Sequence, residues 1–340
     1  SGVGLAVCVW TSRTERAASV RQAMSASSAD TRSTPPTTRH GALPSSLVAQ
    51  RLTPVIGAEI SGIYLRKGIS DKQSDELYSA LMEHEVLFLR DQPGLSPQAQ
   101  LQLARSFGEP EGTHPVYPHC SSCPEVTILE HGSGKAPPDA NEWHTDCTFK
   151  PLPPFTTVLY SRVIPPTGGD TLWCSMTAAY DALPDGVKQY VGTLRAVHDM
   201  GDFRNSLAAS QPDPTAASEA VADGHRKFGS AVHPVVQTHP TTGKKYLFVN
   251  PSFTVHVLGM GAAASRRLLN YLFSHATQPQ FQVRFKWTPD TVVFWDNRCT
   301  MHLALADYLP ASRRMHRVTV LNDRRAGEVE GVPCHPRAKL

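Results

Sequence analysis

The stretch Asn141-Glu142-Trp143-His144-Thr145-Asp146-Cys147-Thr148-Phe149 has a His-x-Asp motif at its centre. Its aromatic and β-branched residues favour an extended strand, in which residues two apart project to the same face. His144 and Asp146 would then point together into one cavity and offer two of the three ligands of a 2-His-1-carboxylate iron site. The motif alone is weak evidence, because a chain with 15 histidines contains about one His-x-Asp by chance. A carboxylate that merely orients a neighbouring histidine is the alternative.

The composition limits the class of protein. The 340 residues are 40% hydrophobic and carry a net charge of +3, which suits a large core in one or two domains. We expect no nucleic acid partner, because no dense basic face is interleaved with aromatic residues. We expect no membrane association either, because no apolar run is long enough to span a bilayer.

The seven cysteines are odd in number and irregularly spaced, which predicts a reducing, cytoplasmic location rather than a disulfide framework. Cys120 and Cys123 form a lone CxxC motif, which is poor evidence for zinc without a second pair. A redox role and a simple loop pair are both open for this motif.

The ends of the chain differ in composition from its middle. Residues 1–45 are rich in Ser, Thr, Ala, Arg and Pro, so we expect a disordered extension. Translation is expected to begin near Met24, and an organelle transit peptide is the alternative. One domain is predicted over residues 46–325, followed by a tail at 326–340.

Hydrophobic periodicity places the regular elements. It predicts helices at 71–85, after Ser96, at 176–191 and at 262–277, and strands at 53–60, 86–89, 156–164, 170–173, 232–236, 245–249, 282–287, 291–295 and 314–321. Residues 112–139 are expected to form a long functional or disordered loop, and 200–230 an insert or lid. Short strands with helices at the flanks, and no GxGxxG or P-loop motif, predict a mainly β jelly roll with α additions.

A third metal ligand is expected near the end of the domain. The apolar strand at 291–295 is followed by an Asp-Asn turn and then by His302. The strand after it places Arg313 and Arg317 on one face, about 13 Å apart. Inward-facing arginines are costly unless each meets an anion, so two separate carboxylate or sulfonate ligands are predicted. Pairing of either arginine with a surface carboxylate is the alternative.

These motifs occur together with several others in a fixed order. The matching segments are 114–119, 143–146, 167–173, 233–236, 248–250, 295–298 and 306–317. In these segments the chain resembles the TauD/TfdA family of Fe(II)- and 2-oxoglutarate-dependent dioxygenases, and its taurine-hydroxylating members most of all. The family fold is a double-stranded β-helix, which is a jelly roll and agrees with the strand pattern.

The resemblance assigns roles to residues at the metal centre. It implies that His144, Asp146 and His302 hold Fe(II), and that 2-oxoglutarate and O2 take the remaining positions on the iron. Thr171 and Arg313 would bind the distal carboxylate of 2-oxoglutarate. No side-chain nucleophile or general base is expected.

The resemblance also implies a substrate site for a small sulfonate. Arg317 and His114 would bind the sulfonate, Tyr117 and Asp139 would lie near the amine, and Phe253 would line the pocket. A positively charged or hydrogen-bond-donating His114 would strengthen the contact with the anion.

The implied reaction hydroxylates taurine at the carbon bearing the sulfonate and releases sulfite and aminoacetaldehyde, together with succinate and CO2. Ala140 stands where the taurine-hydroxylating enzymes have an Asn, so another alkyl sulfonate, an alkyl sulfate ester or a carboxylate is the alternative substrate. A non-catalytic jelly-roll metal-binding protein is the alternative of another class. The family implies a homo-oligomer, either a dimer or a tetramer.

Overall fold

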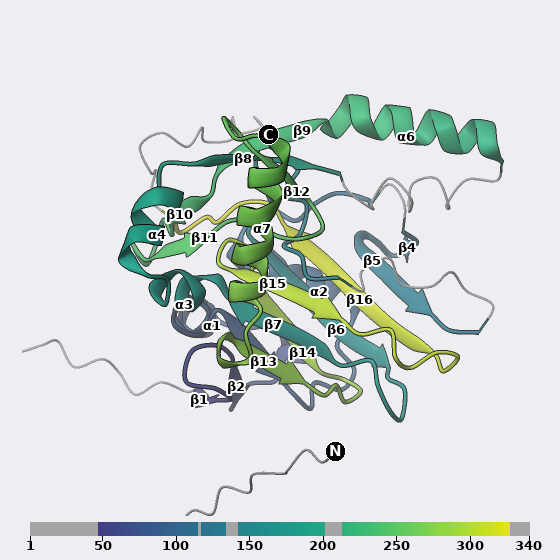
Figure 1. The fold of residues 1–340 in the computed structure, drawn as a ribbon. Helices are drawn as coiled ribbons and strands as arrows, with labels where there is room; N and C mark the ends of the chain where they lie inside the picture. The colour runs from purple at the N-terminus through teal and green to yellow at the C-terminus, as the bar shows by residue number, and fades with distance from the viewer. Residues whose placement is uncertain (1–46, 115–116, 134–141, 201–212, 327–340) are drawn as a thin grey trace, which may run out of the picture. The chain divides into compact units, whose positions relative to one another are not determined.

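A computed structural model describes residues 47–114, 117–133, 142–200 and 213–326 (Figure 1). The predicted extension at 1–45 lies outside these ranges. The architecture is mainly β with flanking helices, as the sequence predicts. None of the helices in the described ranges combines the length and the apolar content needed to span a bilayer.

The largest sheet has eight strands and supplies one wall of the core. Its spatial order is β1 (Val48–Arg51), β2 (Ala58–Ser61), β3 (Val86–Leu89), β14 (Val292–Asp296), β6 (Thr156–Val163), β16 (Arg313–Val320), β5 (Cys123–His131) and β4 (His119–Cys120). Neighbouring strands are antiparallel except β2 and β3, which are parallel. Because β16 lies between β5 and β6, its inward side chains lie well away from the edges of the sheet.

Three smaller sheets complete the β structure. They are β13 (Gln282–Phe285), β7 (Thr171–Ser175) and β15 (Thr300–Ala304); β12 (Thr254–Val257), β8 (Arg195–Asp199) and β9 (Ser230–Pro234); and β10 (Val236–Thr238) with β11 (Lys245–Leu247). The sheet that contains β7 packs against the large sheet through aromatic rings. Phe88 of β3 stacks on Phe285 at 4.2 Å between ring centroids and meets Trp173 edge-on at 5.4 Å. This contact closes the sandwich that surrounds the site.

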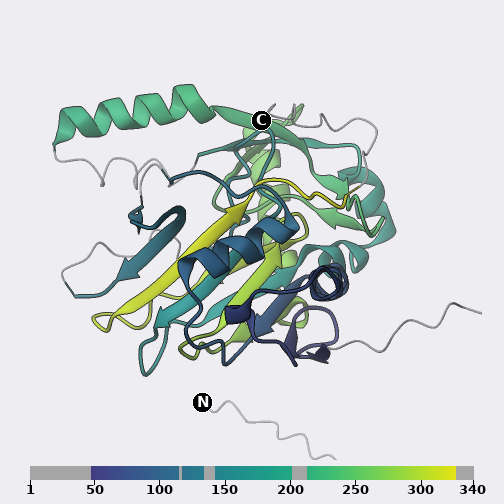
Figure 2. The same cartoon turned by 180° about the vertical axis from the view of Figure 1, so that it is seen from behind.

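Several of the helices pack against the sheets. The described helices are α1 (Asp71–His84), α2 (Pro97–Phe107), α3 (Met176–Asp181), α4 (Asp185–Val191), α6 (Pro214–Phe228) and α7 (Ala262–Ala276), with short 3-10 turns η1 (Leu65–Lys67) and η2 (Pro279–Phe281). A capping box begins α1: the Ser70 hydroxyl accepts from the Gln73 N–H, and the Gln73 side chain accepts from the Ser70 N–H. Figure 2 shows α2 lying across β16, where Gln100 donates to the carbonyl of His316 at 2.9 Å.

Several sequence predictions need correction. The long loop predicted at 112–139 contains the hairpin of β4 and β5, because apolar residues of β5 fill the edge beside β16. The helix predicted over 176–191 is two helices, since Pro184 lacks the N–H that a continuous helix requires. The strand predicted at 53–60 begins only at Ala58. Strands β8, β12 and β15 were not predicted, because runs of four or five residues are too short to give a distinct periodic signal.

Candidate metal centre

Three side chains predicted to bind metal converge in the interior. The Nε2 atoms of His144 and His302 each lie 3.8 Å from Oδ1 of Asp146. All three donor atoms lie within 4.8 Å of one another, and all three residues are buried. Two imidazoles and one carboxylate on one side of a common centre are the donor set that suits non-haem Fe(II).

The backbone brings these residues together by a different route from the one expected. The strand predicted around residue 144 was wrong: His144 forms only an isolated antiparallel bridge with His302. The two residues exchange backbone hydrogen bonds of 3.0 and 2.7 Å. Cys147 then adopts a left-handed conformation, with φ of +50°, in a turn. Asp146 lies at the start of this turn, and its Oδ1 faces both histidines.

The histidine rings are in the state that binds metal. Nδ1 of His144 donates to the carbonyl of Glu142 at 2.9 Å, which turns Nε2 toward Asp146 as the nitrogen that can bind a metal. Burial and the neighbouring His144 lower the pKa of His302 to about 3, so its ring is neutral. Neutral imidazoles are the protonation state required of metal ligands.

A chain of hydrogen bonds fixes the carboxylate of Asp146. The Thr157 hydroxyl donates to Oδ2 of Asp146 at 2.7 Å, and the side-chain amide of Asn297 donates to that hydroxyl at 3.1 Å. The indole of Trp295 donates in turn to Asn297 Oδ1 at 2.9 Å. With Oδ2 occupied, Oδ1 is the oxygen that faces the histidines. Thr157 and Asn297 were not predicted from the sequence, although Asn297 lies in the matched segment 295–298.

The charge of Asp146 follows from its neighbours. Burial opposes ionisation, but His302, Arg317 and His144, with the hydrogen bond from Thr157, hold the pKa of this carboxyl below its ordinary value. Asp146 is therefore an anionic oxygen donor. The protonation states and the directions of all three side chains fit a divalent iron.

Arg313 and Thr171 lie together, as the sequence predicts. Nη2 of Arg313 is 3.5 Å from the Thr171 hydroxyl, which accepts from the Trp287 indole at 3.0 Å. The guanidinium lies over the Trp287 ring, 5.6 Å from its centroid. Arg313 is only 6% exposed, and in the described part of the chain no carboxylate pairs with it. Burial lowers its pKa to about 10, so it remains a buried cation at neutral pH, and a bound anion would stabilise it.

Arg317 has different surroundings from Arg313. Its Nη1 lies 4.0 Å from Oδ1 of Asp146, beside the candidate metal centre. Burial opposes its charge, but the anionic groups around it, led by Asp146, raise its pKa overall. Together these contacts support the predicted face of the strand, since Arg313 and Arg317 both point into the sandwich.

His114 and Tyr117 lie beside Arg317. The backbone N–H of Tyr117 donates to Nδ1 of His114 at 3.2 Å, so the proton of a neutral ring is on Nε2. Burial, with the charges of Arg317 and Lys150, lowers the pKa of His114 to about 3. Of the two states considered from the sequence, the neutral ring that donates from Nε2 is therefore the one that fits these surroundings.

Phe253 forms part of the wall around the metal centre. Its ring meets His144 edge-on at 6.3 Å between centroids and Phe149 at 5.2 Å. Its backbone N–H donates to Oδ1 of Asn250 at 2.9 Å, which fixes the loop before β12. Asp139, the remaining predicted substrate residue, lies outside the described residues, as does Ala140.

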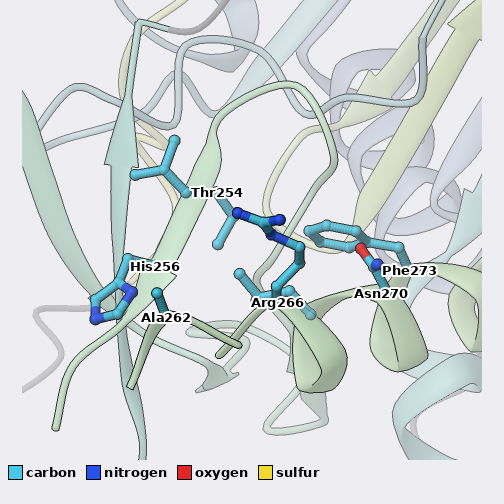
Figure 3. Close-up of a pocket in the computed structure, with 8 residues that line it drawn as sticks. Thr254, His256, Ala262, Arg266, Asn270 and Phe273 are labelled. Carbon is cyan, nitrogen blue, oxygen red and sulfur yellow. The ribbon is translucent and has the colours of Figure 1, made fainter. Parts of the chain in front are cut away.

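A separate pocket of about 160 Å³ lies between β12 and α7 (Figure 3). Arg266, Asn270 and Phe273 of α7 line one side, and Thr254 and His256 of β12 line the other. No residue predicted for the metal or substrate site contributes to it.

The profile of the family described as "Taurine catabolism dioxygenase TauD, TfdA family" matches residues 49–319. The chain belongs to this family. Its members named as alpha-ketoglutarate-dependent dioxygenases use Fe(II), 2-oxoglutarate and O2, and the His-Asp-His cluster is the candidate site for the iron.

Relatives and solved structures agree with this assignment. An alkylsulfatase of Acinetobacter baylyi is 37% identical over 83% of this chain and 86% of its own length. An alpha-ketoglutarate-dependent sulfate ester dioxygenase of Pseudomonas putida is 36% identical over 81% of this chain and 87% of its own. The crystal structure of a taurine dioxygenase from Burkholderia xenovorans has 34% identity and a TM-score of 0.69, covering 82% of this chain and 90% of that one. The predicted jelly-roll core is confirmed by this likeness.

Proposed function

We propose that this protein hydroxylates a small alkyl sulfate ester or sulfonate at the carbon that bears the sulfur-containing head. In this proposal His144, Asp146 and His302 hold Fe(II). Arg313 and Thr171 bind the distal carboxylate of 2-oxoglutarate. Arg317 and Nε2–H of His114 bind the head of the substrate.

The observation that carries the proposal is the presence of two inward arginines in distinct surroundings on β16. Four residues of strand separate Arg313 from Arg317 by about 13 Å, which suits two anions rather than one. Arg313 lies against a threonine hydroxyl and an indole, whereas Arg317 lies 4.0 Å from a candidate iron ligand. An anion on Arg317 would therefore lie against the reacting centre, and an anion on Arg313 would lie deeper in the sandwich.

Each residue has a defined task in this scheme. Iron with 2-oxoglutarate and O2, when bound, supplies the oxidising chemistry that hydroxylates a C–H bond. Arg317 and His114 hold the anionic head, so the adjacent carbon is the one presented to the metal centre. Phe253 covers His144 with an aromatic edge and limits water on that side. Hydroxylation at that carbon gives a product that breaks down to an aldehyde and either sulfate or sulfite.

Two kinds of substrate are supported by different relatives. The sulfate ester is favoured by an alkylsulfatase and a sulfate ester dioxygenase at 37% and 36% identity. Taurine is the second candidate, because taurine dioxygenase structures from Burkholderia xenovorans share the fold at 33% and 34% identity. The non-catalytic alternative is less well supported, because both arginines and all three candidate ligands are present. A homo-oligomeric state and a cytoplasmic location stay predictions.

Succinate formation from 2-oxoglutarate tests the proposal directly. With Fe(II) and O2, hexyl sulfate should yield sulfate, and taurine should yield sulfite if it is accepted. Arg317→Met should raise the KM for the anion at least tenfold and leave 2-oxoglutarate binding intact, because Arg313 is unchanged. The exposed Arg267→Met serves as the matched control. Absence of anion-stimulated succinate with sulfates, sulfonates and carboxylates would refute the proposal.

A further inference from the structure

The segment before His114 runs beside β16 and brings an acidic residue to the substrate side. The N–H of Glu111 donates to the carbonyl of Thr319 at 2.8 Å, and Leu321 donates to Glu109 at 2.8 Å. An antiparallel bridge joins Pro110 to Val320 between them. Residues opposed in an antiparallel pair face the same side, so the Glu111 side chain shares the face of Thr319.

Arg317 is on this same face of β16. It lies two residues from Thr319, which corresponds to about 7 Å along the strand. The carboxylate of Glu111 therefore lies on the substrate side of the sheet. The two residues also interact electrostatically, since Glu111 is among the groups that raise the pKa of Arg317.

Lys150 meets Glu111 at this place. Its Nζ lies 2.7 Å from Oε1 of Glu111, and the two side chains are only 19% and 24% exposed. Lys150 ends the turn that follows Asp146, where its N–H donates to the carbonyl of Cys147 at 3.0 Å. Nε2 of His233 donates to the Lys150 carbonyl at 3.1 Å, which fixes the end of the turn.

The Lys150 ammonium lies within electrostatic range of the residues proposed to bind the substrate head. Lys150 and Arg317 both lower the pKa of His114, and Arg317 opposes the protonation of Lys150 in turn. Arg317 and Lys150 are thus both among the charges that act on His114. The anions near them are already engaged, Asp146 beside the candidate metal centre and Glu111 by Lys150.

We propose that Lys150, held by Glu111, is a specificity-determining residue that selects anions with an uncharged tail over anions that carry an ammonium. This inference rests on the proposed function and names its substrate class. Lys150 adds to the attraction for a sulfate or sulfonate head. It repels a second cation on the same small molecule, and the paired Glu111 offsets part of both the attraction and the repulsion.

The experiment compares two substrates of nearly equal shape, 1-propanesulfonate and taurine, which differ by a methyl group in place of an ammonium. Succinate formation gives kcat/KM for each with wild type, Lys150→Met and Lys150→Arg. Wild type should prefer propanesulfonate, and Lys150→Met should reduce that preference about tenfold, mainly through the KM for propanesulfonate. Lys150→Arg should keep the preference. The exposed Lys245→Met is the matched control and should match wild type.

A second variant makes the test independent of the folding of Lys150→Met. Glu111→Gln releases Lys150 from its counter-charge, so the preference for propanesulfonate should rise rather than fall. Equal losses for both substrates in Lys150→Met, or an unchanged preference in both variants, would overturn the inference. Failure of the proposed function is distinguishable, since in that case neither anion stimulates succinate formation in wild type.

Discussion

Replacement of Thr157 by Val tests how the protein orients its candidate carboxylate ligand. Val keeps the shape and the β-branching that suit the middle of β6, so the strand should persist. The change removes the 2.7 Å hydrogen bond to Oδ2 of Asp146. It also leaves the side-chain amide of Asn297 without the hydroxyl that accepts its hydrogen bond. A hydrogen bond to a charged group contributes about 1.5–3 kcal/mol, and a buried donor left unsatisfied costs about 1–3 kcal/mol. The metal-free variant should therefore be about 3 kcal/mol less stable than wild type.

The effect on metal binding is the more specific part of this prediction. Without Thr157 the carboxylate of Asp146 can rotate, so Oδ1 is no longer held as the only one of its two oxygens that faces His144 and His302. Loss of such an outer contact typically lowers metal affinity about 10–100-fold. Titration with Co(II), followed by absorption, measures the affinity, and urea unfolding measures the stability.

Thr156→Val is the matched control for this experiment. The Thr156 hydroxyl is equally buried and donates to the carbonyl of Trp295 at 2.6 Å, without touching Asp146. It should lose about 1 kcal/mol of stability and bind Co(II) as wild type does. Equal Co(II) affinity in Thr157→Val and Thr156→Val would refute the reasoning.

Three further predictions follow from the same structure. Arg313→Met should raise the Kd for 2-oxoglutarate at least tenfold, measured by calorimetry in the presence of Mn(II), because the buried cation that faces Thr171 is lost. Gly169→Ala should raise the same Kd about tenfold, because Gly169 has φ of +72° and an added methyl would lie only 3.1 Å from Cγ of Pro165 and 3.2 Å from Cδ1 of Tyr308, which would shift the turn that lies against Arg313. Glu85→Gln should flatten the dependence of stability on pH, since burial raises the pKa of Glu85 to about 7. The folded state favours the protonated acid, so wild-type stability should be full below the unfolded pKa and should fall as pH rises from about 4.5 to 7, by about 3 kcal/mol in total.

Matched variants separate these effects from general damage. Glu83→Gln, at a well-exposed neighbour of Glu85, should keep the wild-type pH dependence. Gly186→Ala, where nothing lies within 4 Å of an added methyl, should leave 2-oxoglutarate binding unchanged. Tight 2-oxoglutarate binding by Arg313→Met would contradict its assigned role. A pH dependence in Glu85→Gln identical to that of wild type would contradict the raised pKa.

The elements that the sequence predicted well carry strong local signals. Helix α1 was predicted because Ser70 and Gln73 form a cap at one end of an amphipathic pattern. Strand β14 was predicted because its apolar run is continuous. Strand β15 was missed although it carries His302, because its five residues are too few to give a distinct periodic signal. Its pairing with β7 is a tertiary contact that leaves no mark on the local sequence.

The site was predicted in part for a similar reason. His144 and Asp146 converge as expected, but Asp146 lies at the start of a turn with a left-handed Cys147 rather than in a strand, and β-branched neighbours gave no sign of that turn. Thr157 contacts Asp146 only because the fold places β6 beside the turn that contains Asp146. Glu111 and Lys150 are 39 residues apart in the sequence. They meet because the segment that contains Glu111 runs beside β16. Such contacts depend on the three-dimensional arrangement, so a motif search does not find them.

Anaerobic titration with Fe(II), followed by calorimetry, tests the central claim most directly. Wild type should bind one Fe(II) ion per chain, His302→Ala should lose this binding, and His256→Ala, outside the three-residue cluster, should retain it. Wild-type Fe(II) affinity in His302→Ala would contradict the assignment of His144, Asp146 and His302 as the iron ligands.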